Sequence, residues 1–215
     1  MKTIYCISGL GADERAFSKL SLPGYELKVI PWLMPEKNES IESYATRMRA
    51  GIAEENPILM GLSFGGMICT EIAKQVPVKK LIIISSIKSS DELPAWMKTV
   101  AKLRLHKIVP LKSSRFTEPI QNIMLGANSP EEKMIASEYR KKVNITYTNW
   151  AVNQAINWKN NWQHPATVHI HGDEDRMFPI KNSKPDFTIK NGGHFMIMNK
   201  AGDVSRCINT ILQQD

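Results

Sequence analysis

Residues 61–65 read Gly61-Leu62-Ser63-Phe64-Gly65 and follow directly on the apolar run 57–60. Residues 64–75, which come next, are typical of a helix. A strand, a sharp turn and a helix in this order place the serine at the apex of the turn, where only glycine leaves room two residues before and after it. The helix also directs its positive end towards the serine hydroxyl. We therefore interpret Ser63 as a candidate nucleophile; the alternative is a glycine-rich turn whose serine caps the helix.

Apolar strands and helical segments alternate along the first 86 residues. We predict strands over residues 2–8, 25–32, 57–62 and 80–85, and helices over residues 40–54 and 64–75. Continuous apolar strands that are separated by helices indicate a parallel sheet covered on both faces.

The alternation stops after residue 86. We predict four helices and no strand before residue 160; the helices cover 94–106, 118–125, 130–143 and 146–158. The sheet pattern resumes with strands over 166–170 and 186–189, and an amphipathic helix is predicted over 195–213. The sequence therefore predicts the α/β class, with a mostly parallel sheet of about six strands flanked by helices and interrupted by a helical insertion.

A serine nucleophile needs a base and an acid that orients the base. His194 follows Gly192-Gly193, just after the last predicted strand. A histidine there lies at the carboxyl edge of the sheet, where sites in parallel sheets assemble. The two glycines allow the backbone to turn so that the imidazole reaches Ser63, and His194 is the candidate base.

The candidate acids lie in the loop His171-Gly172-Asp173-Glu174-Asp175, at the same edge. Asp173 follows the glycine directly and can simply cap the turn. Asp175 lies further out, where its side chain can swing back towards His194, so we favour it. Asp91, after the fourth predicted strand, is a more distant alternative.

Three ordered motifs resemble the α/β-hydrolase superfamily, in its small bacterial esterase-like branch with a helical cap. They are Gly61-Leu62-Ser63-Phe64-Gly65-Gly66, His171-Gly172-Asp173-Glu174-Asp175 and Gly192-Gly193-His194-Phe195. The resemblance covers about two thirds of the chain and has the serine, acid, histidine order of that fold. It implies a core of residues 1–86 and 164–215, and a helical cap of residues 87–163 inserted after the fourth strand.

The resemblance also implies roles for individual residues. In that family the acid is the last residue of His-Gly-x-x-Asp, which supports Asp175, and the oxyanion hole uses two backbone N–H groups, here those of Leu10 and Phe64. A pocket is implied beneath the cap. Four cap tryptophans are candidates either to line that pocket or to fill the core of the cap: Trp96, Trp150, Trp158 and Trp162.

The sequence departs from the family pattern in three places. Ser8-Gly9 stands where the family usually has His-Gly in the oxyanion loop. The stretch from Asp175 to His194 leaves little room for the usual helix between the last two strands. Two strands that precede the core in the family are absent, so we expect six parallel strands.

The resemblance implies hydrolysis of an ester, or of a thioester or amide, of a small apolar acyl group through an acyl-enzyme, with no metal or organic cofactor. Cofactor-free lyases and peroxidases and non-catalytic ligand receptors share this fold and stay open as alternatives. Dinucleotide binding is disfavoured, because Gly9-Leu10-Gly11 follows the first strand but Glu14 occupies the third glycine position. The expected partner is a small molecule, and a homodimer is left open.

The charge is uneven along the chain. The 215 residues carry 28 Lys and Arg against 21 Asp and Glu, and residues 87–163 hold 12 of the basic residues against 6 of the acidic ones. The excess of basic residues in this segment indicates either solvated helix faces or a mild preference for anionic substrates or surfaces. We find no nucleic-acid-binding motif and no apolar stretch of the roughly 20 residues that span a bilayer.

The cysteines and the first residues bear on location. Cys6, Cys69 and Cys207 are scattered in apolar runs, so we expect free thiols and a reducing compartment. The first eight residues are typical of a strand rather than a signal sequence, and we expect a cytoplasmic protein. No Cys/His cluster has the spacing of metal ligands.

Overall fold

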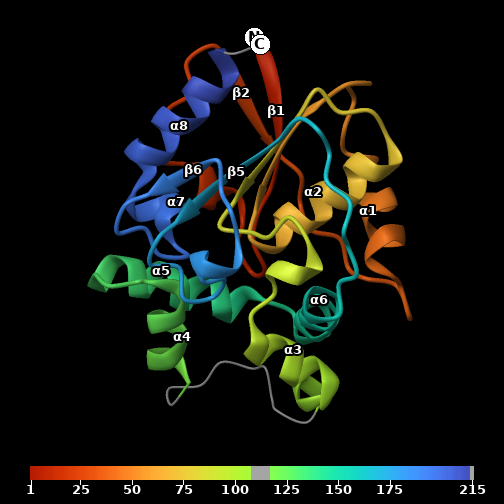
Figure 1. The fold of residues 1–215 in the computed structure, drawn as a ribbon, viewed down its shortest axis with the longest axis vertical. Helices are drawn as coiled ribbons and strands as arrows, with labels where there is room; N and C mark the ends of the chain where they lie inside the picture. The colour runs from red at the N-terminus through yellow and green to blue at the C-terminus, as the bar shows by residue number, and fades with distance from the viewer. Residues whose placement is uncertain (108–116, 214–215) are drawn as a thin grey trace.

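Six parallel strands form the sheet in the computed structural model, which describes residues 1–107 and 117–213 (Figure 1). The order across the sheet is β2-β1-β3-β4-β5-β6, and every neighbouring pair is parallel. The strands are β1 (Lys2–Ile7), β2 (Tyr25–Val29), β3 (Ile58–Leu62), β4 (Lys80–Ile84), β5 (Thr167–Gly172) and β6 (Phe187–Ile189). The predicted parallel α/β sheet of six strands is confirmed.

Helices cover both faces of this sheet, as the continuous apolar strands predict. Every residue of β3 and β4 is buried, and alternate side chains belong to different hydrophobic clusters. Leu59 and Ile83 lie in one cluster, whereas Met60 and Ile82 lie in the other. The covering helices are α1 (Ile41–Arg49) and α2 (Phe64–Gln75) on one face, and η1 (Glu14–Phe17), α7 (Met196–Asn199) and α8 (Ala201–Gln213) on the other (Figure 1).

Two predicted helices are each divided in the structure. The helix predicted over 195–213 is interrupted at Lys200, whose backbone leaves the helical region at φ −126°. Three consecutive residues of α7 are buried, whereas α8 buries a single face, so the chain changes direction between them. The helix predicted over 94–106 becomes α3 (Ala95–Lys102) and η3 (Leu105–Lys107), because Arg104 between them adopts φ +54°.

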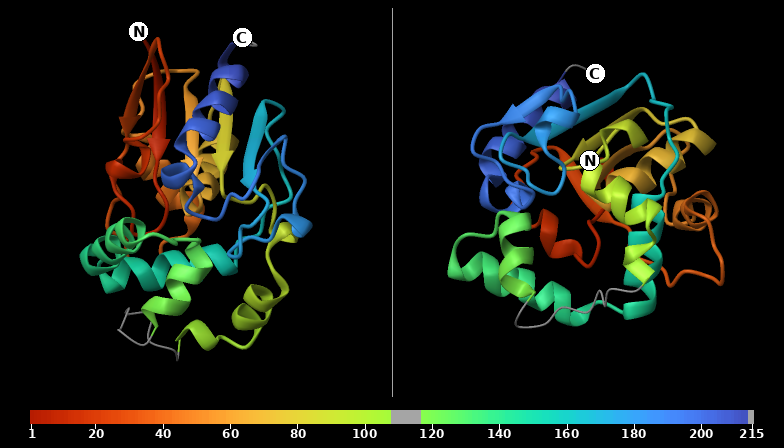
Figure 2. Two further views of the ribbon diagram at one scale, coloured as in Figure 1. Left: turned by 90° about the vertical axis from the view of Figure 1, so that its left-hand side faces the viewer. Right: turned by 60° about the horizontal axis from the view of Figure 1, so that its bottom comes forward.

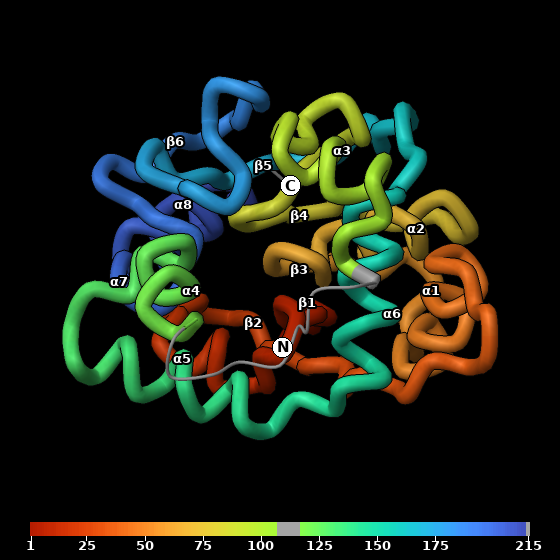
Figure 3. The backbone as a smooth tube through the Cα atoms, turned by 90° about the horizontal axis from the view of Figure 1, so that it is seen from below, coloured from red at the N-terminus to blue at the C-terminus, as the bar shows by residue number. Residues whose placement is uncertain are grey.

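The segment between β4 and β5 is helical in its described parts. Besides α3 and η3 it contains η2 (Ser90–Glu92), α4 (Glu118–Leu125), α5 (Pro130–Lys142) and α6 (Ile145–Ile156). The α-helices of this segment lie beyond the carboxyl ends of the strands and, seen from below, surround the ends of β1 and β3 (Figures 2 and 3). Residues 108–116 of the predicted cap lie outside the described residues. That residues 87–163 form a separate cap stays a prediction.

Other general expectations can be compared with the described residues. Between β5 and β6 these contain one short 3-10 turn, η4 (Ile180–Asn182), in place of a longer helix. The three cysteines are free thiols, and two of them are buried. Within residues 1–107 and 117–213, each helix is too short or too polar to cross a lipid bilayer. No cluster of three or more His, Cys, Asp or Glu side chains in these ranges is arranged to hold a metal ion.

Gly65 allows α2 to pass directly against β1. A Cβ atom on Gly65 would lie 2.1 Å from the carbonyl oxygen of Ile7 and 2.4 Å from that of Ser8. A Cβ on Gly61 would likewise lie 2.5 Å from the carbonyl oxygen of Gly65. Backbone atoms cannot move aside as a flexible side chain can, so these positions admit no side chain.

We expect Gly65→Ala to lower the free energy of unfolding by about 3 kcal/mol, because the added methyl group overlaps the carbonyl groups of Ile7, the last residue of β1, and of Ser8, which follows it. Urea unfolding followed by circular dichroism measures the change. Gly202→Ala is the matched control: its Cβ meets a single side-chain atom at 3.8 Å, and alanine favours the helix by up to about 1 kcal/mol. Equal stability of the two variants would contradict the close approach at residue 65.

Candidate active site

Ser63 occupies a strained turn between β3 and α2. Its backbone has φ 52° and ψ −120°, a conformation that non-glycine residues rarely adopt. The Ser63 N–H donates to the carbonyl oxygen of Ile84 at 2.9 Å, and its carbonyl oxygen accepts from Gly66 N–H at 2.9 Å and from the Ser86 hydroxyl at 2.7 Å. The Ser63 side chain makes no capping hydrogen bond with α2, so the alternative of a helix-capping serine is wrong.

His194 lies next to the Ser63 hydroxyl. The loop after β6 carries its imidazole to the carboxyl edge of β3, where Nε2 is 2.9 Å from Ser63 Oγ and Nδ1 is 2.8 Å from Asp175 Oδ2. A carboxylate can only accept, so Nδ1 donates to Asp175 and Nε2 is left to accept the serine proton. A serine hydroxyl thus faces an imidazole nitrogen, and an acid fixes the tautomer of that imidazole.

Asp175 is the acid that the structure brings to His194. It is buried, whereas the competing candidates Asp173 and Asp91 are exposed and make no contact with His194. Asp175 Oδ1 also accepts hydrogen bonds from the N–H groups of Met177 and Phe178, both at 2.8 Å. Burial by itself would raise the pKa of this carboxyl, but His194 and the hydrogen bonds outweigh burial and hold the pKa below its usual value.

The loop after β1 lies directly against the serine. A Cβ on Gly9 would be 3.3 Å from the Cβ of Ser63. Ser8, which stands where histidine was expected, supports this loop: its hydroxyl donates to the carbonyl oxygen of Ala12 at 2.7 Å and accepts from Trp32 Nε1 at 2.9 Å. The next residue after Gly9 is Leu10, one of the two residues predicted to supply an oxyanion-hole N–H.

Two backbone N–H groups near the serine lack an acceptor. Among the hydrogen bonds of the described residues, neither the Leu10 N–H nor the Phe64 N–H is a donor. Phe64 is the first residue of α2, where helix N–H groups have no partner within the helix. Both residues border the cavity that contains Ser63. They are therefore available to a group bound there, and their role as an oxyanion hole stays a prediction.

A cavity of about 1200 Å³ opens at Ser63 and His194. Side chains from α3, α4, α5 and α6 line it together with the loops of the sheet, and most of them are apolar. Its aliphatic lining includes Leu10, Met67, Met97, Val100, Met124, Leu125, Val143, Val152, Ile156 and Ile197.

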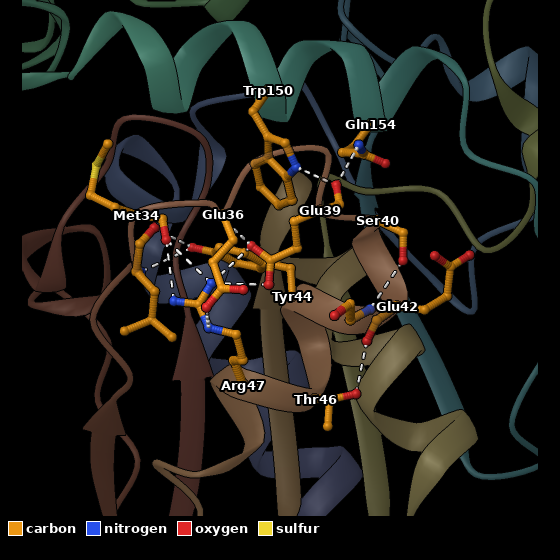
Figure 4. Close-up of polar contacts among 12 residues, drawn as sticks. Met34, Glu36, Glu39, Ser40, Glu42, Tyr44, Thr46, Arg47, Trp150 and Gln154 are labelled. Atoms are coloured by element: carbon orange, nitrogen blue, oxygen red, sulfur yellow. Dashed lines mark hydrogen bonds and ion pairs between the residues drawn. The ribbon is translucent and has the colours of Figure 1, made fainter.

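The tryptophans of this segment occupy different positions. Trp96 borders the cavity, but the expectation that Trp150 and Trp158 line it is wrong. The indole N–H of Trp150 donates to the carbonyl oxygen of Glu39 at 2.8 Å (Figure 4), and that of Trp158 donates to Glu71 Oε1 at 2.7 Å. Each N–H is thus paired away from the cavity, as a buried indole requires. Trp162 is not among the lining residues either, and it is 39 % exposed.

Two further histidines, for which the sequence predicts no role, lie next to Asp175. His169 and His171 alternate along β5, are completely buried, and contact each other with His169 Nε2 3.0 Å from His171 Nδ1. Burial, together with the repulsion that a second protonated ring at His171 would cause, lowers the pKa of His169 to about 3. Burial lowers the pKa of His171 as well, although Asp175 opposes that shift. The spacing of two residues, which puts both rings on one face of the strand, was the available signal.

Comparisons with known proteins agree with this architecture. No protein-family model and no curated protein matches the sequence, but many solved structures match the fold. A thermophilic esterase from Thermogutta terrifontis with malate bound is 15 % identical, with 100 % of this chain and 90 % of that chain covered and a TM-score of 0.76. A putative lipase from Acinetobacter baumannii is 15 % identical (99 % and 84 % covered, TM-score 0.75), and a bromoperoxidase from Bacillus anthracis is 14 % identical (99 % and 92 %, TM-score 0.72).

We expect the stability of the protein to fall as the pH decreases from 7 to 5, because the buried His169 resists protonation. Above pH 6.5 this histidine is neutral in both states; below it the unfolded chain binds a proton that the folded protein refuses until about pH 3. The expected loss from His169 is about 2 kcal/mol at pH 5. Urea unfolding at the two pH values measures it.

The variant His169→Gln removes the titrating group and should reduce this pH dependence, whereas His164→Gln, at a partly exposed histidine, should retain it. The same loss of stability between pH 7 and 5 in the wild type and in His169→Gln would show that residue 169 is not the group responsible.

Proposed function

We propose that this chain, which has the fold of the α/β-hydrolases as its three ordered motifs predicted, is a serine hydrolase that cleaves carboxylic esters. The observation that carries the proposal is the continuous pair of hydrogen bonds from Ser63 Oγ to His194 and from His194 to Asp175, at 2.9 and 2.8 Å. Three side chains that are far apart in the sequence come together in the order that nucleophilic catalysis needs.

The geometry supports acyl transfer in two steps, acylation of Ser63 and hydrolysis of the acyl-enzyme. His194 Nε2 accepts the Ser63 proton as Oγ attacks the ester carbonyl carbon, and the imidazolium then gives that proton to the departing alcohol. Water attacks the resulting acyl-enzyme with the same histidine as base, which releases the acid and restores the Ser63 hydroxyl. Asp175 keeps the imidazole in the required tautomer and stabilises its charged form.

The carbonyl oxygen that becomes negative would lie at the N–H groups of Leu10 and Phe64. The Phe64 N–H begins α2 and the Leu10 N–H lies in the loop that the Ser8 hydroxyl ties to Ala12, so both are oriented before the substrate arrives. Each aimed donor of this kind lowers the barrier by about 3 kcal/mol. The positive end of α2 favours the same negative charge.

The cavity supports an apolar acyl group larger than the small one expected from the sequence. Its volume of about 1200 Å³ exceeds that of most small-molecule sites, which are about 300–1000 Å³. Helices α3 to α6 act in this proposal as a cap that excludes water from the acyl chain. The aliphatic side chains of the cap and of the core would then hold the chain by burial rather than by hydrogen bonds.

We expect Ser63→Ala to lower kcat for 4-nitrophenyl butyrate by more than about 10⁴-fold, and Asp175→Asn to lower it by about 10⁴-fold, because they remove the nucleophile and the group that orients the base. The release of 4-nitrophenol measures both. Asp173→Asn is the matched control and should change kcat by less than about twofold, because Asp173 is exposed and does not contact His194.

Equal losses in Asp175→Asn and Asp173→Asn, or full activity in Ser63→Ala, would contradict the assignment. A fluorophosphonate probe separates hydrolysis from the other roles that this fold serves. Labelling of Ser63 without hydrolysis across a panel of acyl esters would favour a lyase, a peroxidase or a ligand receptor over the proposed esterase.

A further inference from the structure

Phe178 touches the acid, the base and the cavity of the site. Its N–H donates to Asp175 Oδ1 at 2.8 Å, and its ring meets the His194 ring edge-on at a centroid distance of 5.5 Å. The side chain is buried and borders the cavity. A shift of Phe178 would therefore move the carboxylate and the imidazole together.

His171 holds the carbonyl group of Phe178. The distance from His171 Nε2 to that oxygen is 2.7 Å, and because a carbonyl oxygen can only accept, Nε2 must carry the proton. His171 Nε2 also lies 3.6 Å from Asp175 Oδ2, which is too long for a hydrogen bond. His171 therefore has no hydrogen bond to the acid, and besides its direct electrostatic effect on Asp175 its contact with the acid runs through Phe178.

His169 supports the tautomer of His171 that the Phe178 carbonyl oxygen requires. His171 is buried and neutral, so with the proton on Nε2 its Nδ1 can only accept a hydrogen bond. His169 Nε2, 3.0 Å away, is the donor. Without that donor, His171 Nδ1 would be a buried nitrogen that has lost its hydrogen bond, whereas the Phe178 carbonyl oxygen would still favour the proton on Nε2.

We propose that His171 is a positioning residue: it holds Phe178, and through Phe178 the acid and the base, in their reactive arrangement, and His169 supports it through the hydrogen bond to Nδ1. The naming of Asp175 and His194 as acid and base rests on the proposed function, whereas the tautomer of His171 does not. If the two buried histidines had only a structural role, substituting them would change the stability of the protein and leave the turnover of the folded protein unaltered.

Leucine and glutamine substitutions separate these roles. The amide nitrogen of glutamine occupies a place similar to that of histidine Nε2, so His169→Gln and His171→Gln keep a donor that leucine removes. We expect kcat for 4-nitrophenyl butyrate to fall about tenfold in His171→Leu, the effect of the lost hydrogen bond to Phe178, and less than about threefold in His169→Leu, which keeps that bond, with KM within twofold in both. Both glutamine variants should stay within about threefold of the wild-type kcat.

The double variant His169→Leu/His171→Gln tests whether the donor to Phe178 is what matters. It keeps that donor and removes the histidine pair, so it should stay within about threefold of the wild-type kcat. Equal losses of kcat in His171→Leu and His171→Gln would overturn the proposal, as would a tenfold loss in the double variant.

Nitrogen-15 NMR of the histidine rings gives a readout that needs no turnover. Both the wild type and His169→Leu should show His171 protonated on Nε2. Protonation on Nδ1 in the wild type overturns the proposal even if no leucine variant folds. If no ester is hydrolysed but the tautomer is as stated, the proposed function has failed and the hydrogen bond from His171 to Phe178 stands.

Discussion

The backbone of α2 touches the backbone of β1 at Gly65, and the position of Ser63 depends on that contact. Because no side chain separates the two backbones, β1 fixes the position at which α2 begins. Hydrogen bonds to Ile84 and Ser86 then fix the same turn to the end of β4. The serine is thus held by both strands that flank β3, and its strained φ of 52° is sustained by the sheet rather than by the serine itself.

Asp175 and His194, the proposed acid and base, reach Ser63 because parallel strands all end at one edge of the sheet. Asp175 and His194 lie on the loops that follow β5 and β6, and neither is exposed to more than a few per cent. Burying such polar groups is unfavourable unless each has a partner. Here each partner is another group of the site: Asp175 accepts from two N–H groups and from His194. The network that positions the chemistry therefore also compensates for its own burial.

The site residues that the sequence predicts are those whose positions follow from neighbouring residues. The turn at Ser63 and the loops that carry Asp175 and His194 could be predicted because glycines and strand or helix patterns flank them. The sites of Trp150 and Trp158 were not, since each indole N–H pairs with a group more than 80 residues away. His171 hydrogen-bonds to the backbone carbonyl group of Phe178. Because every residue has such a group, the sequence does not indicate this contact. The helix is interrupted at Lys200, and α7 before it is buried at three consecutive residues. Such burial depends on the surrounding fold, so the helical periodicity of the sequence does not predict it.

A crystal structure of the protein after reaction with diethyl 4-nitrophenyl phosphate tests the central claim most directly, because the bound phosphoryl group has the shape of the tetrahedral intermediate. The account predicts a covalent bond from Ser63 Oγ to phosphorus, with the phosphoryl oxygen about 2.7–3.1 Å from the N–H nitrogens of Leu10 and Phe64 and His194 still hydrogen-bonded to Asp175. An unmodified Ser63 beside a reagent bound elsewhere, or a phosphoryl oxygen directed away from both N–H groups, would contradict it.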